Sequence, residues 1–321
     1  PPQLGSDRPI AVLAVPLAAP PLPLPHYMLE NGTELDAALL NDPDLETGES
    51  VPLAADRSGA VIARFAKPET VRSLRIFLPR LRNTFRGMPI RGVLEARQQG
   101  EWQFVTDLPL SPVPTTVGFP PTTASAFRVR FTATPEPDMS HFQGGPGSID
   151  IPIYSAPVLT EAPLTELRFS AEEQTARAEE KAGYQTVLDY HAIADRGDAP
   201  AAIADTAQII DLTERIGADG TLDWIPPAGR QWRILSFGWS LTGKTNHPAP
   251  PEATGLEVDK FDPAAVRRYL EAYLGMYRDA GAVGLDAILT DSIEVGMANW
   301  TPRMEAEFEA RRGYKLRPWL P

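Results

Sequence analysis

The first half of the chain alternates apolar and polar residues with the period of two that strands show in a sheet with one buried face. Residues 71–78 follow this pattern, and so does a later stretch in which Phe127, Val129 and Phe131 fall on one side. Turn residues separate such segments about every ten positions, which is typical of a sandwich of antiparallel strands. The pattern therefore predicts a β-sandwich over residues 26–155.

A hairpin and a fully covered strand are also predicted in this half. The segments 92–96 and 102–105 flank the turn Gln98-Gln99-Gly100, an arrangement that indicates a hairpin. Residues 10–15, with the sequence IAVLAV, are continuously apolar, which favours a strand covered on both faces. We assign residues 1–25 to a barrel-associated strand and its linker.

After about residue 240 the apolar residues take the spacing of a helix instead. Asp262-Pro263 is an N-cap with proline at the first helical position. The apolar residues that follow it at helical spacing are Val266, Leu270, Tyr273, Leu274 and Tyr277. A strand over 285–290 comes next, and a second helix opens at Thr301-Pro302 and stops at Gly313. Alternating strands and helices predict βα units of a parallel sheet or barrel.

These elements define the expected fold class, α/β plus β. A complete (β/α)8 barrel takes about 250 residues, far more than the 241–321 segment that carries its pattern. We therefore predict part of a (β/α)8 barrel with the β-sandwich inserted in it. Residues 156–240 form a mixed, β-rich connecting region.

Composition and charge narrow the class of function. The chain has 42 acidic and 30 basic residues, a net charge of −12, which argues against nucleic acid and an anionic membrane as partners. It has no cysteine, which excludes disulfides, thiolate metal sites and a cysteine nucleophile. The chain does not begin with methionine, and no basic segment precedes its first apolar run. We expect an internal piece of a longer polypeptide, whose remainder is a partner.

Two acids follow the strand predicted over 285–290. The sequence ILTDSIEVG places Asp291 and Glu294 at the carboxyl end of that strand, where parallel sheets and barrels build ligand sites. A glycosidase needs one carboxylic acid with a raised pKa, and a neighbouring charge from Asp291 would help to keep Glu294 protonated. The alternative is a solvated turn in which Asp291 caps backbone amides, because the DxxE pattern alone is weak.

A second group of polar residues lies in the loop predicted after the strand near 232–237. Asn246 and His247 are candidates for hydrogen bonds to sugar hydroxyls, although His247 could instead fix a proline-rich turn. Glu257 and Asp259 are two positions apart and would suit a shared hard cation or a polyol. Their alternative is an ion pair with Lys244 or Lys260. Trp300, just past the acids, could stack on a sugar ring or anchor the last helix.

Five of these segments together resemble glycoside hydrolase family 106, the α-L-rhamnosidases. The order and spacing of the segments make the resemblance specific over residues 205–321. The segments are TGKTNHPAPP at 242–251, GLEVDK at 255–260, DSIE at 291–294, NWTP at 299–302 and RRGY at 311–314.

The resemblance implies an inverting α-L-rhamnosidase on a (β/α)8 barrel, with a galactose-binding-like sandwich and a calcium ion whose ligands are unknown. The family's acid corresponds to Glu294, with Asp291 beside it, and its general base lies beyond Pro321. The chain alone is therefore expected to be inactive. The implied substrates are rhamnose-containing glycosides or polysaccharides. The implied substrate-binding residues are Asn246, His247, Glu257, Asp259, Lys260 and Trp300.

Further expectations concern the location of the protein in the cell and other classes of function. Relatives in bacteria degrade glycosides in the periplasm or after uptake, so the resemblance leaves a periplasmic or cytoplasmic location, with the periplasm favoured. A different class of function is a non-catalytic carbohydrate-binding protein built on the sandwich. A purely structural piece of a larger assembly is the third alternative.

Overall fold

The computed structural model describes residues 8–81, 88–134, 159–187, 190–193, 205–246, 249–282, 284, 286, 287, 289 and 296–321. The contacts divide the chain into two compact units, Ala18–Ala202 and a second that joins Pro1–Leu17 to Ile203–Pro321. Across the described ranges, no helix is both long and apolar enough to cross a membrane.

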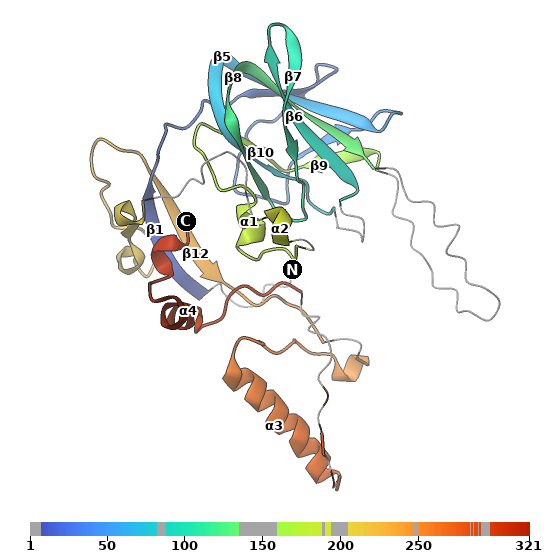
Figure 1. Cartoon of the computed structure of the whole chain (residues 1–321), viewed down its shortest axis with the longest axis vertical. Helices are drawn as coiled ribbons and strands as arrows, with labels where there is room; N and C mark the ends of the chain where they lie inside the picture. The colour runs from blue at the N-terminus through green and yellow to red at the C-terminus, as the bar shows by residue number, and fades with distance from the viewer. Residues whose placement is uncertain are drawn as a thin grey trace, which may run out of the picture. The chain divides into compact units, whose positions relative to one another are not determined.

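The unit Ala18–Ala202 is a β-sandwich (Figure 1). Its described part contains a seven-stranded antiparallel sheet in the order β3-β2-β5-β8-β6-β7, with β10 paired to β5, and a two-stranded sheet of β4 and β9. The strands are β2 (His26–Leu29), β3 (Glu34–Leu35), β4 (Glu49–Pro52), β5 (Ser58–Phe77), β6 (Ile90–Gln98), β7 (Glu101–Leu108), β8 (Thr115–Ala133), β9 (Glu161–Leu164) and β10 (Glu166–Ser170), and the helices are α1 (Ala178–Lys181) and α2 (Tyr190–Ile193).

The core of the sandwich follows from the alternation in the sequence. Phe127, Val129 and Phe131 are buried on one face of β8, as predicted. Phe127 packs edge-on against Phe65, with 6.2 Å between ring centroids, and lies 5.4 Å from Phe169. These rings bury large apolar areas, so they are a main source of stability for the unit.

The predicted hairpin is confirmed by the pairing of β6 with β7. Only Gln99 and Gly100 separate the two strands, and both have positive φ, 52° and 87°. Two consecutive residues in the left-handed region are typical of the turn that matches the twist of a two-residue hairpin. Glycine adopts this conformation without steric cost, which explains its place here.

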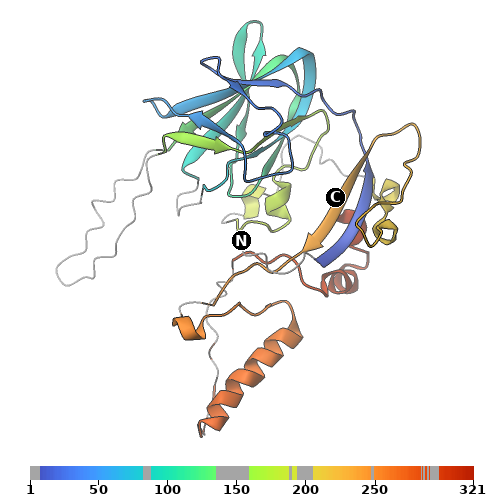
Figure 2. The same cartoon turned by 180° about the vertical axis from the view of Figure 1, so that it is seen from behind.

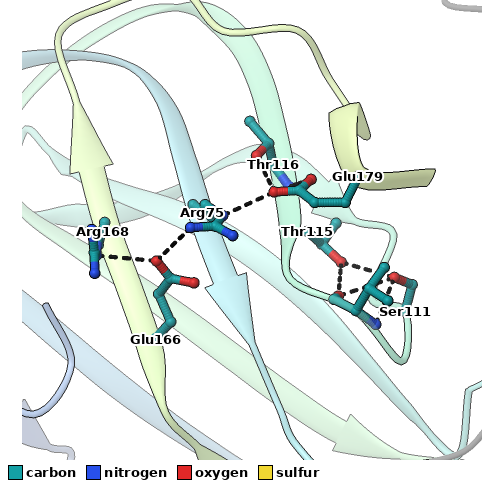
Figure 3. A network of polar contacts seen from close by, with 8 residues as sticks. Arg75, Ser111, Thr115, Thr116, Glu166, Arg168 and Glu179 are labelled. Atoms are coloured by element: carbon teal, nitrogen blue, oxygen red, sulfur yellow. Dashed lines mark hydrogen bonds and ion pairs between the residues drawn. The ribbon is translucent and has the colours of Figure 1, made fainter. Parts of the chain in front are cut away.

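A network of charged side chains attaches α1 to the sheet (Figure 3). Arg75 donates to Glu166 Oε1 at 3.0 Å and to Glu179 Oε1 at 2.9 Å. Arg168 lies 3.0 Å from the same oxygen of Glu166, and the Thr116 hydroxyl donates to Glu179. Burial raises the pKa of the fully buried Glu166 carboxyl, although the two guanidinium groups oppose this shift. The network joins β5, β8, β10 and α1.

The bounds of the sandwich differ from those that the sequence predicts. Strands β9 and β10 lie beyond residue 155, yet β9 pairs with β4 and β10 with β5. The partners in these pairs are 89 to 115 positions apart in the chain, and local periodicity carries no information on such pairing. The region predicted as 156–240 is consequently divided between the two units near residue 202.

The other unit contains a three-stranded sheet in the order β11-β1-β12 (Figure 2). Strand β1 (Arg8–Pro16) lies between β11 (Ile210–Asp211) and β12 (Trp232–Trp239), and both pairings are antiparallel. Ala11, Leu13 and Ala14 are buried, in agreement with the continuous apolar run of the sequence. The described pairings of this sheet are thus not the parallel ones expected of a barrel.

The helices of this unit lie near their predicted positions. Helix α3 (Pro263–Asp279) begins after Asp262, whose carboxylate accepts from the Ala264 amide at 2.9 Å. Helix α4 (Met304–Arg312) ends at Gly313, at φ 76°. Arg303, and not Thr301, is its N-cap. No residue of α3 is buried, so its predicted apolar face has no cover within the described part. The short turns here are η2 (Thr206–Gln208), η3 (Thr213–Arg215), η4 (Pro251–Ala253) and η5 (Arg317–Trp319).

Candidate active site

The loop after β12 folds back on itself as an irregular hairpin. Thr245 and Leu256 form an isolated antiparallel bridge, and the Glu257 amide donates to the Lys244 carbonyl at 2.9 Å. The Asn246 side chain fixes the two arms, because its Oδ1 accepts from the Gly255 amide at 2.7 Å and its Nδ2 donates to the Ala253 carbonyl at 3.1 Å. Asn246 therefore shapes the loop, while its predicted contact with substrate stays a prediction.

The two carboxylates of this loop have separate partners. Glu257 accepts from the Lys260 ammonium group at 2.9 Å. Asp259 Oδ1 accepts from the Phe261 amide at 2.8 Å, and Oδ2 accepts from the Thr301 hydroxyl at 2.9 Å. The ion pair with lysine that the sequence left open as an alternative is thus the arrangement observed for Glu257.

The bond between Asp259 and Thr301 joins the two predicted site segments. These residues are 42 positions apart, and Thr301 is only 4% exposed. Trp300, which precedes Thr301, is half-buried. The hydrogen bond thus brings the loop over 255–260 next to the segment 299–302. The Thr-Pro pair predicted a helix cap at Thr301, and no local signal indicated its contact with a distant carboxylate.

The remaining predicted site residues lie outside the described ranges. They are His247, Asp291 and Glu294. Of the strand predicted over 285–290, the structure describes Asp286, Ala287 and Leu289; they are exposed and are not in a strand, contrary to the prediction. The roles of the three predicted site residues, and the parallel βα arrangement around them, stay predictions.

The expected calcium ion finds no fit among the described residues. No group of three or more acidic, histidine or cysteine side chains with the spacing of a metal site occurs there. Glu257 and Asp259 are held by an ammonium group and by separate hydrogen-bond donors, so the pair does not form a shared site for a hard cation. We derive no chemical step through calcium.

A cleft of about 440 Å³ lies elsewhere in this unit, and it does not include the predicted site residues. Arg317 lines this cleft, where it donates two hydrogen bonds of 2.9 Å to Glu305 and one of 3.3 Å to Asp211. Burial works to raise the pKa of Asp211, but hydrogen bonds from Thr213 and Arg317 outweigh it and hold that pKa below its usual value. The cleft is lined by Leu13, Ile209, Asp211, Glu305, Ala306, Glu309, Lys315, Leu316, Arg317 and Pro318.

Known proteins include relatives that are similar to this chain in sequence and, in one case below, also in structure. A rhamnosidase from Novosphingobium sp. PP1Y is 40% identical and superimposes with a TM-score of 0.79, over 98% of this chain and 28% of that one. A protein of Formosa agariphila named "Putative beta-glucuronidase" is 44% identical over 124 residues, which are 37% of this chain and 11% of that protein. The chain thus spans less than a third of the length of either relative.

The family comparison covers nearly the whole chain. The model of glycoside hydrolase family 106, described as alpha-L-rhamnosidase, matches residues 17–321. The match includes both the sandwich and the segments of the candidate site. The chain therefore belongs to glycoside hydrolase family 106, the alpha-L-rhamnosidases.

Proposed function

We propose that the protein hydrolyses terminal α-L-rhamnosides in rhamnose-containing glycosides or polysaccharides. Membership of the family over residues 17–321 supports this reaction, as does the 40% identity with a named rhamnosidase. In this proposal, residues 241–321 supply βα units to a (β/α)8 barrel, whose other units come from the remainder of the polypeptide.

Glu294 is the proposed general acid. It protonates the glycosidic oxygen as the bond to the anomeric carbon breaks, so that the aglycone leaves as a neutral alcohol. Asp291, three positions earlier, disfavours a second negative charge nearby and keeps Glu294 protonated until the reaction begins. A solvated turn would give these two carboxyls no such roles.

A second carboxylate completes the proposed inverting mechanism. It takes a proton from a water molecule, which attacks the anomeric carbon from the face opposite the departing group. Inversion needs about 6.5–9.5 Å between the two carboxyl groups, because the water lies between the base and the sugar. We place this base in the remainder of the polypeptide.

One observation carries the location of the site: the hydrogen bond from Thr301 to Asp259. It fixes the segment that follows Glu294 to the loop that carries Asn246, Glu257 and Lys260. Glu294 stands seven positions before Thr301 in the sequence, so we expect it to lie near the polar side chains of this loop. Those side chains and the ring of Trp300 are the proposed contacts for sugar hydroxyls and for a pyranose face.

The test is hydrolysis of a natural rhamnoside by the full-length protein and its Glu294→Gln variant. Loss of a general acid costs typically about 10²- to 10⁴-fold in rate, so we expect a fall of that size in kcat with the fold retained. Glu46→Gln, an exposed carboxyl in the sandwich, is the matched control and should leave kcat unchanged. Turnover of the Glu294 variant at the rate of the control would sink the assignment.

A further inference from the structure

Strands β6, β7 and β8 lie side by side in the sandwich (Figure 1), and their side away from the core carries aromatic and charged residues. Because Phe127, Val129 and Phe131 point into the core, the alternate residues Arg128 and Arg130 lie on the opposite side of β8. We call this side the outer face. Its central residues, placed by the pairing of the three strands, are Glu95, Arg97, Trp102, Phe104, Arg128 and Arg130.

The Arg128 side chain is held in place on the outer face by several contacts. Arg128 donates to Glu95 at 2.6 Å and to Glu30 at 2.9 Å, and its guanidinium lies 4.6 Å from the centre of the Trp102 ring. Arg130 lies 3.5 Å from the second oxygen of Glu95. A guanidinium held by two carboxylates and an aromatic ring loses little freedom when a ligand arrives.

Next to this cluster lies an exposed aromatic ring. Phe104 is 63% exposed, although it stands in the middle of a strand, directly opposite Glu95. An exposed ring on the same face as a guanidinium is suited to a pyranose: the apolar C–H face of the sugar covers Phe104, while its hydroxyls accept from Arg130.

The charge of the outer face favours an acidic ligand. Arg64 and Arg91 lie on this side through their pairing with β8, and Arg97 lies opposite Trp102. Within the part of the chain that the structure describes, none of these three forms an ion pair with a carboxylate. The Arg97 guanidinium lies 5.9 Å from the centre of the Trp102 ring. Guanidinium groups without a carboxylate partner, on a protein of net charge −12, are complementary to carboxylates from outside it.

We propose that the outer face binds a glycan chain that contains uronic acids. One sugar stacks on Phe104, and the arginines pair with uronate carboxylates along the chain. The idea rests on the proposed function for its biological setting, since a rhamnose polymer that also carries uronic acids would then be bound by the same polypeptide that hydrolyses it. A flat site of this kind binds weakly alone and gains from being linked to a second site on the same polymer.

The test uses the 321-residue chain and a polysaccharide of alternating rhamnose and galacturonic acid, with affinity electrophoresis as the readout. Phe104→Ala and Arg130→Ala should each weaken binding by about fivefold or more, because each removes one direct contact with the sugar. Tyr184→Ala, an aromatic residue 58% exposed outside the outer face, is the matched control and should bind as the unchanged chain does. Reduction of the uronate carboxyls should abolish most of the binding.

Three results would overturn this proposal. They are failure of the unchanged chain to bind, binding that survives both substitutions, and binding that is equal after carboxyl reduction. Sedimentation that shows a dimer lost in Phe104→Ala would instead make the outer face a contact between two copies. Hydrolysis of a small aryl rhamnoside by the full-length protein distinguishes the outer-face proposal from the proposed function. If the protein hydrolyses this substrate but does not bind the polymer, only the outer-face proposal fails. If it binds the polymer but does not hydrolyse the substrate, only the proposed function fails.

Discussion

Replacement of Thr301 by valine tests whether the link between the two site segments matters for activity. Valine keeps the shape of threonine but removes the hydroxyl that donates to Asp259 at 2.9 Å. A hydrogen bond to a charged group contributes about 1.5–3 kcal/mol, and Asp259 is half-buried, so we take the lower end, about 1.5 kcal/mol. Since 1.4 kcal/mol corresponds to a factor of about ten, the aligned arrangement of the segments should become about tenfold less favoured.

The assay is steady-state hydrolysis, by the full-length protein, of an α-L-rhamnoside with a sugar leaving group, whose departure needs protonation. We expect kcat/KM to fall about tenfold in Thr301→Val, because misplacement of the acid weakens contacts made in the transition state. Thr301→Ser restores the hydroxyl and should recover most of this loss, which distinguishes the hydrogen bond from a general packing defect. If Thr301→Val kept the full kcat/KM while folded, the link would have no part in positioning the site.

The remaining predictions concern stability. Phe127→Ala removes a fully buried ring that packs against two others, so the free energy of unfolding in urea should fall by about 3–5 kcal/mol. Phe104→Ala removes an exposed ring and should change this free energy by under about 0.5 kcal/mol. Equal losses in the two variants would contradict the placement of the core. The pKa of Asp211 is lowered in the folded chain, so its stabilising contribution is present above its ordinary pKa, 3.8, and is lost as the pH falls through the lowered value. The free energy of unfolding should therefore fall less on acidification in Asp211→Asn than in the unchanged chain. The same pH dependence in both proteins would refute this contribution.

Local patterns in the sequence were enough for much of the sandwich. The alternation around Phe127, Val129 and Phe131 identified its core, and Gln99-Gly100 identified a hairpin, since both signals lie within a few residues of chain. Strands β9 and β10 could not be assigned in this way, because their pairing with β4 and β5 is decided by contacts with distant residues. Tertiary context, and not propensity, sets such boundaries.

In the candidate site, too, contacts between distant residues could not be predicted from local sequence features. The choice between a shared cation and an ion pair for Glu257 depended on where Lys260 points, which spacing alone does not determine. The role of Thr301 was hidden because a Thr-Pro pair before a helix is also an ordinary cap signal, and its true partner, Asp259, lies 42 positions away. Segment order is the basis for assigning these residues to one site, but it carries no information on which of them contact one another.

The most direct test of the central claim compares Glu294→Gln with the unchanged full-length protein on two α-L-rhamnosides that differ only in their leaving group. A poor leaving group, such as a sugar alcohol, needs protonation, whereas a nitrophenolate departs without it. If Glu294 is the general acid, kcat should fall by about 10²-fold or more on the first substrate and much less on the second. Equal losses on both substrates, or no loss on either, would contradict the account.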